Sequence, residues 1–285
     1  MASAGRFWKH VRVLGLRLNT WRSGTARVTL PLAIVIVGWI FAGYFYISFR
    51  KHERISEQAH FDAIVGATQV RLEQQLEAYK DVVRGAAQFL TGATKMDNEM
   101  WKAYVQRLHF QERYPYSSAM SISVPASTEE LPALELRQRA LGFPTFRVHA
   151  PPLMAVDGSV GEHFIILYME PLTPTAIGAD HAMEPHRRAA ILRARDTGEL
   201  VITEPTTVLR EGIQSTAFLL FMPVYRAGST LDTVADRRAA LKAIASATFT
   251  PQGFFDSVLR PLQGQLIAEA FIGPIASAKI GRAHV

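Results

Sequence analysis

The side chains best suited to chemistry gather between Gly178 and Glu204, where carboxylates and histidines stand among apolar residues. We single out Asp180, because a carboxylate in an otherwise apolar pocket is costly unless it is paired. Asp180 could accept hydrogen bonds from N–H groups of a small ligand and so orient it. Asp also caps helices, and a helix is expected from Ala182 onward. From the residues alone, the cap is the favoured interpretation.

The same stretch holds a weak metal-ligand pattern. His181 and His186 are five residues apart, so they share a helix face poorly, although Asp180 and Glu184 lie nearby. No metal and no cofactor is therefore predicted.

The remaining polar residues of this stretch suggest structural roles. Arg188 and Arg195 can pair with neighbouring carboxylates, which predicts an ordinary solvated helix face. Thr197 and Gly198 predict a turn, because glycine adopts positive φ without steric cost.

Signatures of common enzyme classes are missing from the sequence. It contains no phosphate-binding glycine loop, no H-E-x-x-H pair and no G-x-S-x-G elbow. Cysteine is absent, which excludes disulfides, thiolate zinc sites and a cysteine nucleophile. Acidic residues are plentiful but scattered, so no pair of carboxylates indicates a glycosidase. No catalytic site is predicted.

The elements that position these residues begin with a membrane anchor at 28–49, whose 28–48 run is uncharged. It exceeds the apolar part of a signal peptide, and no small-residue cleavage site follows it. A buried core helix is the alternative, but that would not explain the flank 1–27, which carries six Lys/Arg and no acid. This flank accounts for the whole net charge of +6, so nucleic acid is not an expected partner. The excess of basic residues predicts a cytoplasmic tail, with the rest outside the cytoplasmic (inner) membrane.

After the anchor, the pattern predicts an α/β domain with antiparallel-type sheets behind a long helix at 53–92. Residues 72–90 carry a heptad-like apolar stripe: Leu72, Leu76, Tyr79, Val83, Ala86 and Leu90. The stripe fits a stalk that pairs with its twin in a homodimer, and equally a helix that packs on its own domain. Further helices are expected at 96–110, 128–141, 182–195 and 254–259, strands at 118–124, 145–149, 163–170, 200–203, 206–210 and 216–225, a turn at 157–158, and a helix or the start of a strand at 236–244. We expect the apolar strand 163–170 to be central.

Three sequence blocks resemble the CHASE domain, an extracytoplasmic sensor module. The densest block is 178–204, with Gly178, Asp180 and Arg188, then Arg193 to Gly198 (RARDTG) and Thr203. A second block ends a strand in Pro223-Val224-Tyr225, and the third contains Trp101, Tyr104, Val105 and Tyr114-Pro115.

The resemblance implies a long helix followed by two PAS-like subdomains, at 50–260, in a receptor that binds a small molecule. It makes Asp180 a ligand-binding residue, together with the main chain of Ile202 and the side chain at Phe221. With it, the ligand role of Asp180 is favoured over the cap. Plant members bind cytokinins, which are adenine derivatives. Phe221 and Met222 replace the polar and aromatic residues of those receptors, so another small apolar ligand is favoured over a cytokinin.

Receptors of this family usually continue into a cytoplasmic output domain, such as a histidine kinase or a diguanylate cyclase. We therefore expect 261–285 to be an incomplete C-terminal part, whose last six residues resemble a reading frame of a sequencing adapter. A natural short tail is the simpler interpretation. The alternative function is a membrane-anchored binding or structural protein without output.

Overall fold

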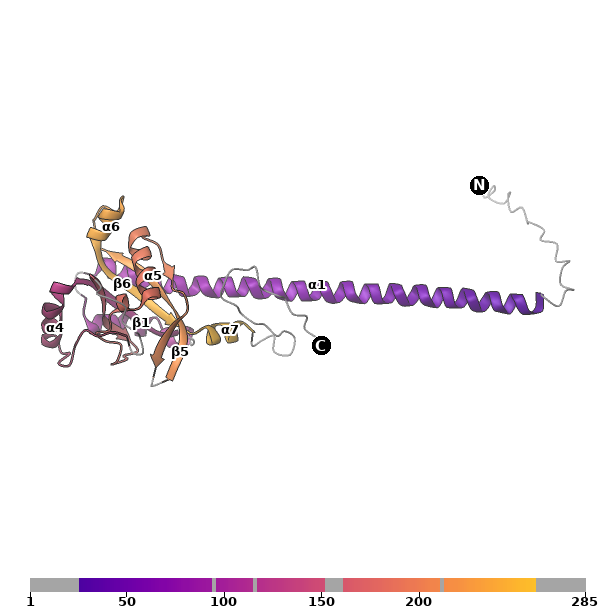
Figure 1. Ribbon diagram of the computed structural model, residues 1–285, viewed down its shortest axis with the longest axis horizontal. Coiled ribbons are helices and arrows are strands. Elements are labelled where there is room, and N and C mark those ends of the chain that lie inside the picture. The colour runs from indigo at the N-terminus through magenta and orange to yellow at the C-terminus, as the bar shows by residue number, and fades with distance from the viewer. Residues whose placement is uncertain (1–25, 94–95, 115–116, 152–160, 211–212, 260–285) are drawn as a thin grey trace, which may run out of the picture. The chain divides into compact units, whose positions relative to one another are not determined.

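The computed structural model describes residues 26–93, 96–114, 117–151, 161–210 and 213–259 (Figure 1). The chain divides into two compact units, Met1–Gly66 and Ala67–Val285. Three predicted features lie outside the described residues: the basic tail up to residue 25, the turn at 157–158 and the C-terminal part from 261. Where the resemblance implies two PAS-like subdomains, the strands of the described residues form one six-stranded sheet.

Helix α1 runs without interruption from Ala26 to Gly92, over 67 residues. The sequence predicts two helices here, at 28–49 and 53–92. No proline follows Pro31 inside the helix, and Pro31 lies close enough to its start to be tolerated, so nothing breaks the helix between the two parts. The predicted stop at Gly92 is confirmed.

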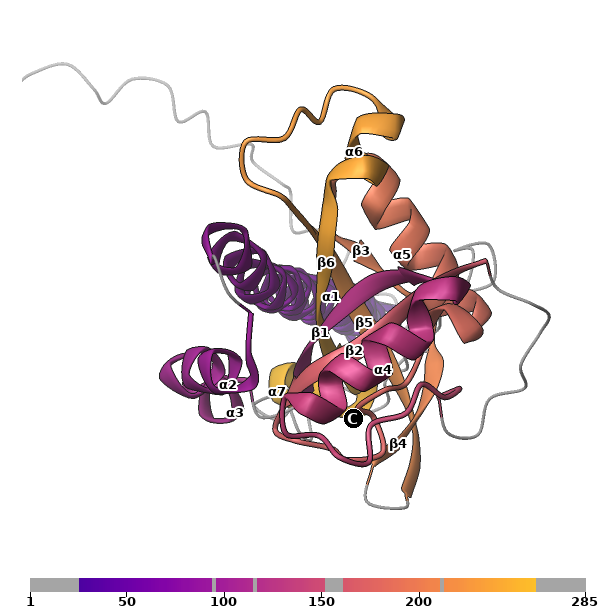
Figure 2. The same ribbon diagram turned by 90° about the vertical axis from the view of Figure 1, so that its left-hand side faces the viewer.

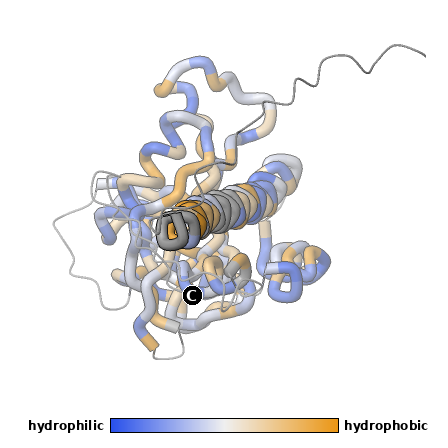
Figure 3. The backbone as a smooth tube through the Cα atoms, turned by 90° about the vertical axis from the view of Figure 1, so that its right-hand side faces the viewer, coloured by the Kyte–Doolittle hydropathy of each residue, from blue (hydrophilic) through white to orange (hydrophobic). Residues whose placement is uncertain are grey.

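The part of α1 in the first unit contains a segment that is long and apolar enough to cross a membrane, Pro31–Ser48. Its residues are exposed, as lipid-facing residues would be. Viewed along its axis, the helix is hydrophobic near this end and mixed further along (Figure 3). Length and composition therefore agree with the predicted anchor.

The second unit is built on a six-stranded antiparallel sheet, which confirms the predicted fold class (Figure 2). Strand order is β2-β1-β6-β5-β3, with β4 also paired to β5. The strands are β1 (Ser117–Ser127), β2 (Glu162–Glu170), β3 (Val201–Ile202), β4 (Thr206–Arg210), β5 (Ile213–Tyr225) and β6 (Leu241–Phe249).

The prediction that the apolar strand 163–170 is central was wrong, because β2 lies at one edge of the sheet. It is nonetheless buried from His163 to Tyr168. Its open side is covered by the segment before η2, where Ile166 N donates to Ala179 O and Gly178 N donates to Ile166 O. A covered edge strand therefore has the same apolar pattern as a central one.

The helices of this unit largely follow the sequence expectations. They are α2 (Asn98–Arg107), α3 (Phe110–Arg113), α4 (Leu131–Ala140), α5 (Pro185–Thr197), α6 (Val234–Ala240) and α7 (Pro251–Leu259), with short 3-10 turns η1 (Thr128–Glu130) and η2 (His181–Met183). Asp97 caps α2 by accepting a hydrogen bond from Met100 N. The stretch 236–244 is both helix and strand. The predicted strand at 145–149 is wrong: only His149 forms a bridge, to Ala179.

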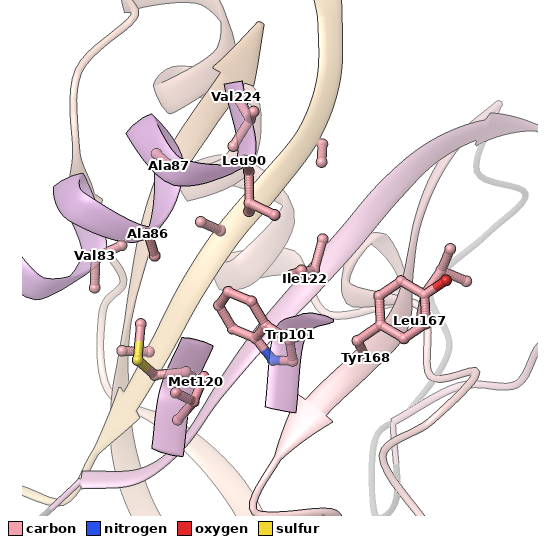
Figure 4. Packing of buried hydrophobic residues seen from close by; sticks show 14 of the residues in the cluster. Val83, Ala86, Ala87, Leu90, Trp101, Met120, Ile122, Leu167, Tyr168 and Val224 are labelled. Carbon is pink, nitrogen blue, oxygen red and sulfur yellow. The ribbon is translucent and has the colours of Figure 1, made fainter. Parts of the chain in front are cut away.

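One face of the sheet packs against α2 and the last turns of α1 (Figure 4). Tyr79, Val83, Ala86 and Leu90 of the heptad-like stripe are buried in this core. Trp101 of α2 is fully buried among them. The stripe therefore packs on its own domain, and that interpretation of the sequence is confirmed.

Lys242 of β6 fastens the end of α1 to the sheet. Its ammonium donates to Leu90 O at 2.8 Å and to Ala93 O at 2.7 Å. The last carbonyls of a helix have no partner within the helix, and a cation complements its negative dipole end. This contact joins residues that are about 150 positions apart in sequence.

The other face of the sheet carries a second core, formed with η2 and α5. Phe164, Leu219, Phe221 and Ile244 of the sheet meet Ala182, Ala190, Ile191 and Ala194 there. In Figure 2 the sheet lies between α1 and α5. We call the space between the sheet and η2/α5 the α5 layer.

Candidate functional site

The α5 layer has an unusual number of polar side chains for a buried core. Ser121 of β1 is paired in register with Ser246 of β6, and Ser246 with Phe221 of β5, so these three residues form a row across the sheet. Successive side chains of a strand point to opposite faces of the sheet. The three row residues therefore lie on one face, and Ile122 and Ala245 lie on the other face, towards α1. All three row residues are nearly inaccessible to solvent.

Two of these serines are hydrogen-bonded to each other, and a third buried serine has no partner among the described residues. The hydroxyls of Ser121 and Ser246 are 2.6 Å apart. Ser123, two residues further along the same face of β1, is fully buried, and its Oγ has no hydrogen-bond partner in the described part of the chain. A buried hydroxyl without a partner costs about 1–3 kcal/mol.

His181 of η2 lies over this row. Its ring is edge-on to Phe221, with centroids 5.1 Å apart. Only 2% of His181 is exposed, and neither ring nitrogen has a partner among the described residues. Burial, together with the nearby charge of Arg187, lowers the pKa of His181 well below its ordinary value. The ring is therefore neutral at pH 7 and offers one donor and one acceptor.

Two further unpaired polar groups lie near the start of α5. The side chain of Glu184 caps α5 by accepting from His186 N and Arg187 N. Arg187 is buried, and its Nη2 donates to Thr207 O at 2.9 Å. Its Nε has no hydrogen bond within the described chain and stands 3.8 Å from Glu184 Oε2. Burial lowers the pKa of Arg187, and the charge of Glu184 opposes that shift. The buried hydroxyl of Thr206 also lacks a partner among the described residues.

Asp180 is held by its own chain. Its Oδ1 accepts from Phe164 N and from Ala182 N, both at 2.9 Å, and its Oδ2 is 2.6 Å from His163 Nδ1. The bond to Ala182 N makes it the cap of η2, so the capping interpretation is confirmed. Its part in ligand binding stays a prediction.

Gly178 explains the start of the same block. It has φ +87°, and a Cβ there would lie 2.0 Å from the carbonyl oxygen of Arg147. Only glycine fits such a position. Gly178 therefore lets the chain pass close to the 147–149 segment before Asp180 enters the α5 layer.

The structure separates the other two predicted ligand-binding residues. Phe221 lies in the α5 layer. Ile202 is paired with Leu220, and its side chain packs against the core on the α1 side. The side chain of Ile202 is therefore on the opposite face of the sheet, and any role in the site rests with its main chain.

The RARDTG block builds an ion-pair network rather than a solvated face. Arg195 is buried and pairs with Glu162 and Asp196, so its predicted exposure was wrong while its predicted pairing with Asp196 is confirmed. Asp196 also pairs with Arg238 at 2.6 Å, and the hydrogen bonds from Arg238 and Arg195 lower the pKa of Asp196. Burial explains the error, because β2 and α6 close over the helix end.

Other motif residues complete this frame. Gly198 has φ 78° and ends α5, as predicted, while Thr197 Oγ1 donates to Arg193 O. Tyr225 donates its hydroxyl proton to Arg195 O at 2.6 Å. Thr203 Oγ1 accepts from Leu219 N, and Pro223 of β5 stands opposite Ile244. Arg188 is half-buried on α5.

The sequence pattern indicates His181 only as a weak metal ligand and gives no role to Ser123, Thr206 or Arg187. The alternation in Ser121-Ile122-Ser123 was the available signal, since it puts hydroxyls where a core strand would carry apolar residues. His186, the other histidine, is exposed beside Glu204. Within the described ranges no cluster of three or more potential metal ligands occurs.

Comparison with known families and structures adds to this geometry. The family model of the CHASE domain matches residues 94–271, more than half of the chain. No curated protein matches.

Two solved structures are similar to the chain. One is the ligand-binding domain of the amino acid chemoreceptor PctC of Pseudomonas aeruginosa PAO1 in complex with GABA, with 17% identity, a TM-score of 0.40 and 67% of this chain covered. The other is the periplasmic sensory domain of the chemoreceptor Tlp1 of Campylobacter jejuni, with 13% identity, a TM-score of 0.39 and 72% covered. The match spans slightly less than two thirds of each of those chains, 64% and 62%.

Proposed function

Because the chain belongs to the CHASE-domain family, we propose that it is a membrane-anchored sensor that binds a small molecule in the α5 layer. The observation that carries this proposal is the group of buried, unpaired polar atoms on Ser123, His181, Arg187 and Thr206. All four residues lie on the α5 side of one sheet.

A bound ligand would compensate for the free-energy cost of these unpaired groups. Buried polar groups in folded proteins are almost always hydrogen-bonded, and each exception needs an explanation. Four such residues in one layer would cost several kcal/mol, about 1–3 kcal/mol each, without a partner. A bound small molecule that hydrogen-bonds to them would recover that free energy, and Phe221 and Phe164 would contact its apolar part.

The predicted site residues enter this proposal in different ways. Phe221 contributes its side chain. Asp180 positions η2, and its Oδ2, with a single hydrogen bond to His163, keeps acceptor capacity that a ligand could use. Ile202 contributes main-chain atoms of β3. Adenine-like molecules remain among the candidate ligands.

The membrane anchor and helix α1 would carry the signal of ligand binding. The anchor at Pro31–Ser48 fixes the domain to the inner membrane, with the domain on the periplasmic side and the tail in the cytoplasm. Binding would then be passed along α1 of a homodimer to a histidine kinase or diguanylate cyclase output domain, which lies outside these 285 residues.

Thermal unfolding of the full chain in detergent tests the proposal. A ligand present at about 100 times its Kd adds about 2.7 kcal/mol to the stability of the native state. We expect at least one compound, from a panel of adenine derivatives and other small amphipathic molecules, to raise Tm. The rise should vanish in Ser123→Val, which replaces the unpaired hydroxyl by methyl groups.

Ser117→Val is the matched control. Ser117 is a buried serine at the start of the same strand, about 20 Å from Ser123 along an extended chain. It should keep the ligand-induced rise. Absence of any rise across the panel in a folded sample would contradict a sensor and favour a binding or structural protein of another kind.

A further inference from the structure

His181 is the side chain best placed to recognise a ligand by hydrogen bonds. Its ring is buried against Phe221, and both nitrogens are unpaired within the described chain. A neutral imidazole presents one N–H donor and one bare acceptor nitrogen. Ser123 and Thr206 add hydroxyls, which both donate and accept. Most unpaired groups of the α5 layer are therefore neutral and can both donate and accept hydrogen bonds.

The charged groups of the layer already have partners within the domain. Asp180 holds two backbone N–H groups and His163. Glu184 holds two backbone N–H groups at the start of α5. Arg187, the cation next to His181, is 3.8 Å from Glu184 and donates to Thr207 O. Each charge thus has a partner of opposite sign or several hydrogen bonds.

Binding a charged ligand in this layer would consequently carry a large desolvation cost. Moving an ion out of water costs several kcal/mol unless a free opposite charge meets it. An uncharged ligand avoids this cost and still satisfies the imidazole, provided that it carries a donor beside an acceptor.

Resting on the proposed function, we propose that the α5 layer selects an uncharged ligand with an apolar body and an amide-like edge, and that His181 is the residue that recognises this edge. Primary amides, lactams and N–H azoles have such an edge. A carboxylate held by Arg187 is the competing chemistry, and it belongs to the outcomes of the test.

Matched triplets of small molecules separate these possibilities. Benzamide, benzoate and benzamidinium have nearly the same shape and are neutral, anionic and cationic. Equivalent triplets on other apolar bodies, such as indole and cyclohexane, widen the set. Binding of each probe to the full chain in detergent is measured by saturation-transfer NMR and titration.

Three variants complete the experiment. His181→Phe keeps an aromatic ring at this position but removes both polar nitrogens, and His181→Gln keeps a donor and an acceptor. Ser117→Ala is the control outside the layer. We expect the amides to bind best in the wild type, to lose about tenfold in Kd in His181→Phe, equivalent to about 1.4 kcal/mol, and to recover most of that loss in His181→Gln.

The outcomes distinguish this inference from the function on which it rests. Preferred binding of the carboxylates or amidiniums, or amide binding unchanged in His181→Phe, overturns the ligand class but keeps a small-molecule site. If no probe of any charge binds to the folded chain, both the ligand class and the proposed function are wrong.

Discussion

Replacing Asp180 by Ala tests whether this carboxylate stabilises the fold of the domain. The substitution leaves three groups without their partner: Phe164 N, Ala182 N and His163 Nδ1. Each buried group left unpaired costs about 1–3 kcal/mol, so the loss from three groups should be about 3–9 kcal/mol. That is a large part of the 5–15 kcal/mol by which a typical domain is stable, about half for many domains.

Urea unfolding followed by the fluorescence of Trp101 measures this loss. The chain has four tryptophans, and changing Trp8, Trp21 and Trp39 to Phe leaves Trp101, which is buried beside the sheet, as the single reporter. With a slope of about 2 kcal/mol/M, a loss of 4 kcal/mol lowers the midpoint by about 2 M. A midpoint within 0.5 M of the wild type, or about 1 kcal/mol, would refute the reasoning.

Asp180→Asn is the matched variant. Its amide oxygen can still accept from both backbone N–H groups, and its NH₂ can donate to His163 Nδ1 in the tautomer that carries its proton on Nε2. We expect a loss of only about 1 kcal/mol. Loss of ligand binding in Asp180→Ala alone would therefore say little about the site, which is why Ser123 and His181 are the better probes.

The remaining predictions concern the frame and the membrane. Lys242→Met removes the cation that caps α1 and should destabilise the domain by about 1–3 kcal/mol in the same urea assay, whereas Lys102→Met, at an exposed lysine, should change little. The lowered pKa of Asp196 means that its paired carboxylate contributes stability above the ordinary carboxylate pKa, and that this contribution is lost as pH falls towards the folded-state pKa; Asp196→Asn should flatten the acid side of the stability–pH curve, and an unchanged slope would contradict the network. Since the chain lacks cysteine, single-cysteine variants can map orientation: Ala227→Cys, in an exposed turn, should react with an impermeant maleimide on cells with an opened outer membrane, and Ser3→Cys only after lysis.

The heptad-like stripe shows where sequence reasoning reaches its limit. A helix that pairs with a twin and a helix that packs on its own sheet both need an apolar residue every three or four positions. Tyr79, Val83 and Leu90 are buried in the core of their own domain, and the three alanines of β6 that meet them are small. Those partners lie more than 150 positions away in sequence, so periodicity within the helix could not choose between the two arrangements.

The same limit applies to the candidate site. Local patterns were enough to predict the capping role of Asp180 and the turn at Gly198, because caps and turns depend on neighbouring residues. The role of His181 depends on η2 placing its ring on Phe221, which is 40 positions further along the chain. A lone histidine in the sequence carries no sign of that burial. Buried unpaired atoms become visible only when the fold brings their surroundings together.

Strand β6 connects these two parts of the molecule. Ile244 and Ser246 point into the α5 layer, while Ala243, Ala245 and Ala247 belong to the core shared with α1. Lys242 at the start of the same strand holds the last carbonyls of α1. A protein core is close-packed, so a displacement of β6 on one face is felt on the other. The layer that would hold a ligand and the helix that leads towards the membrane anchor are therefore separated by the thickness of one strand.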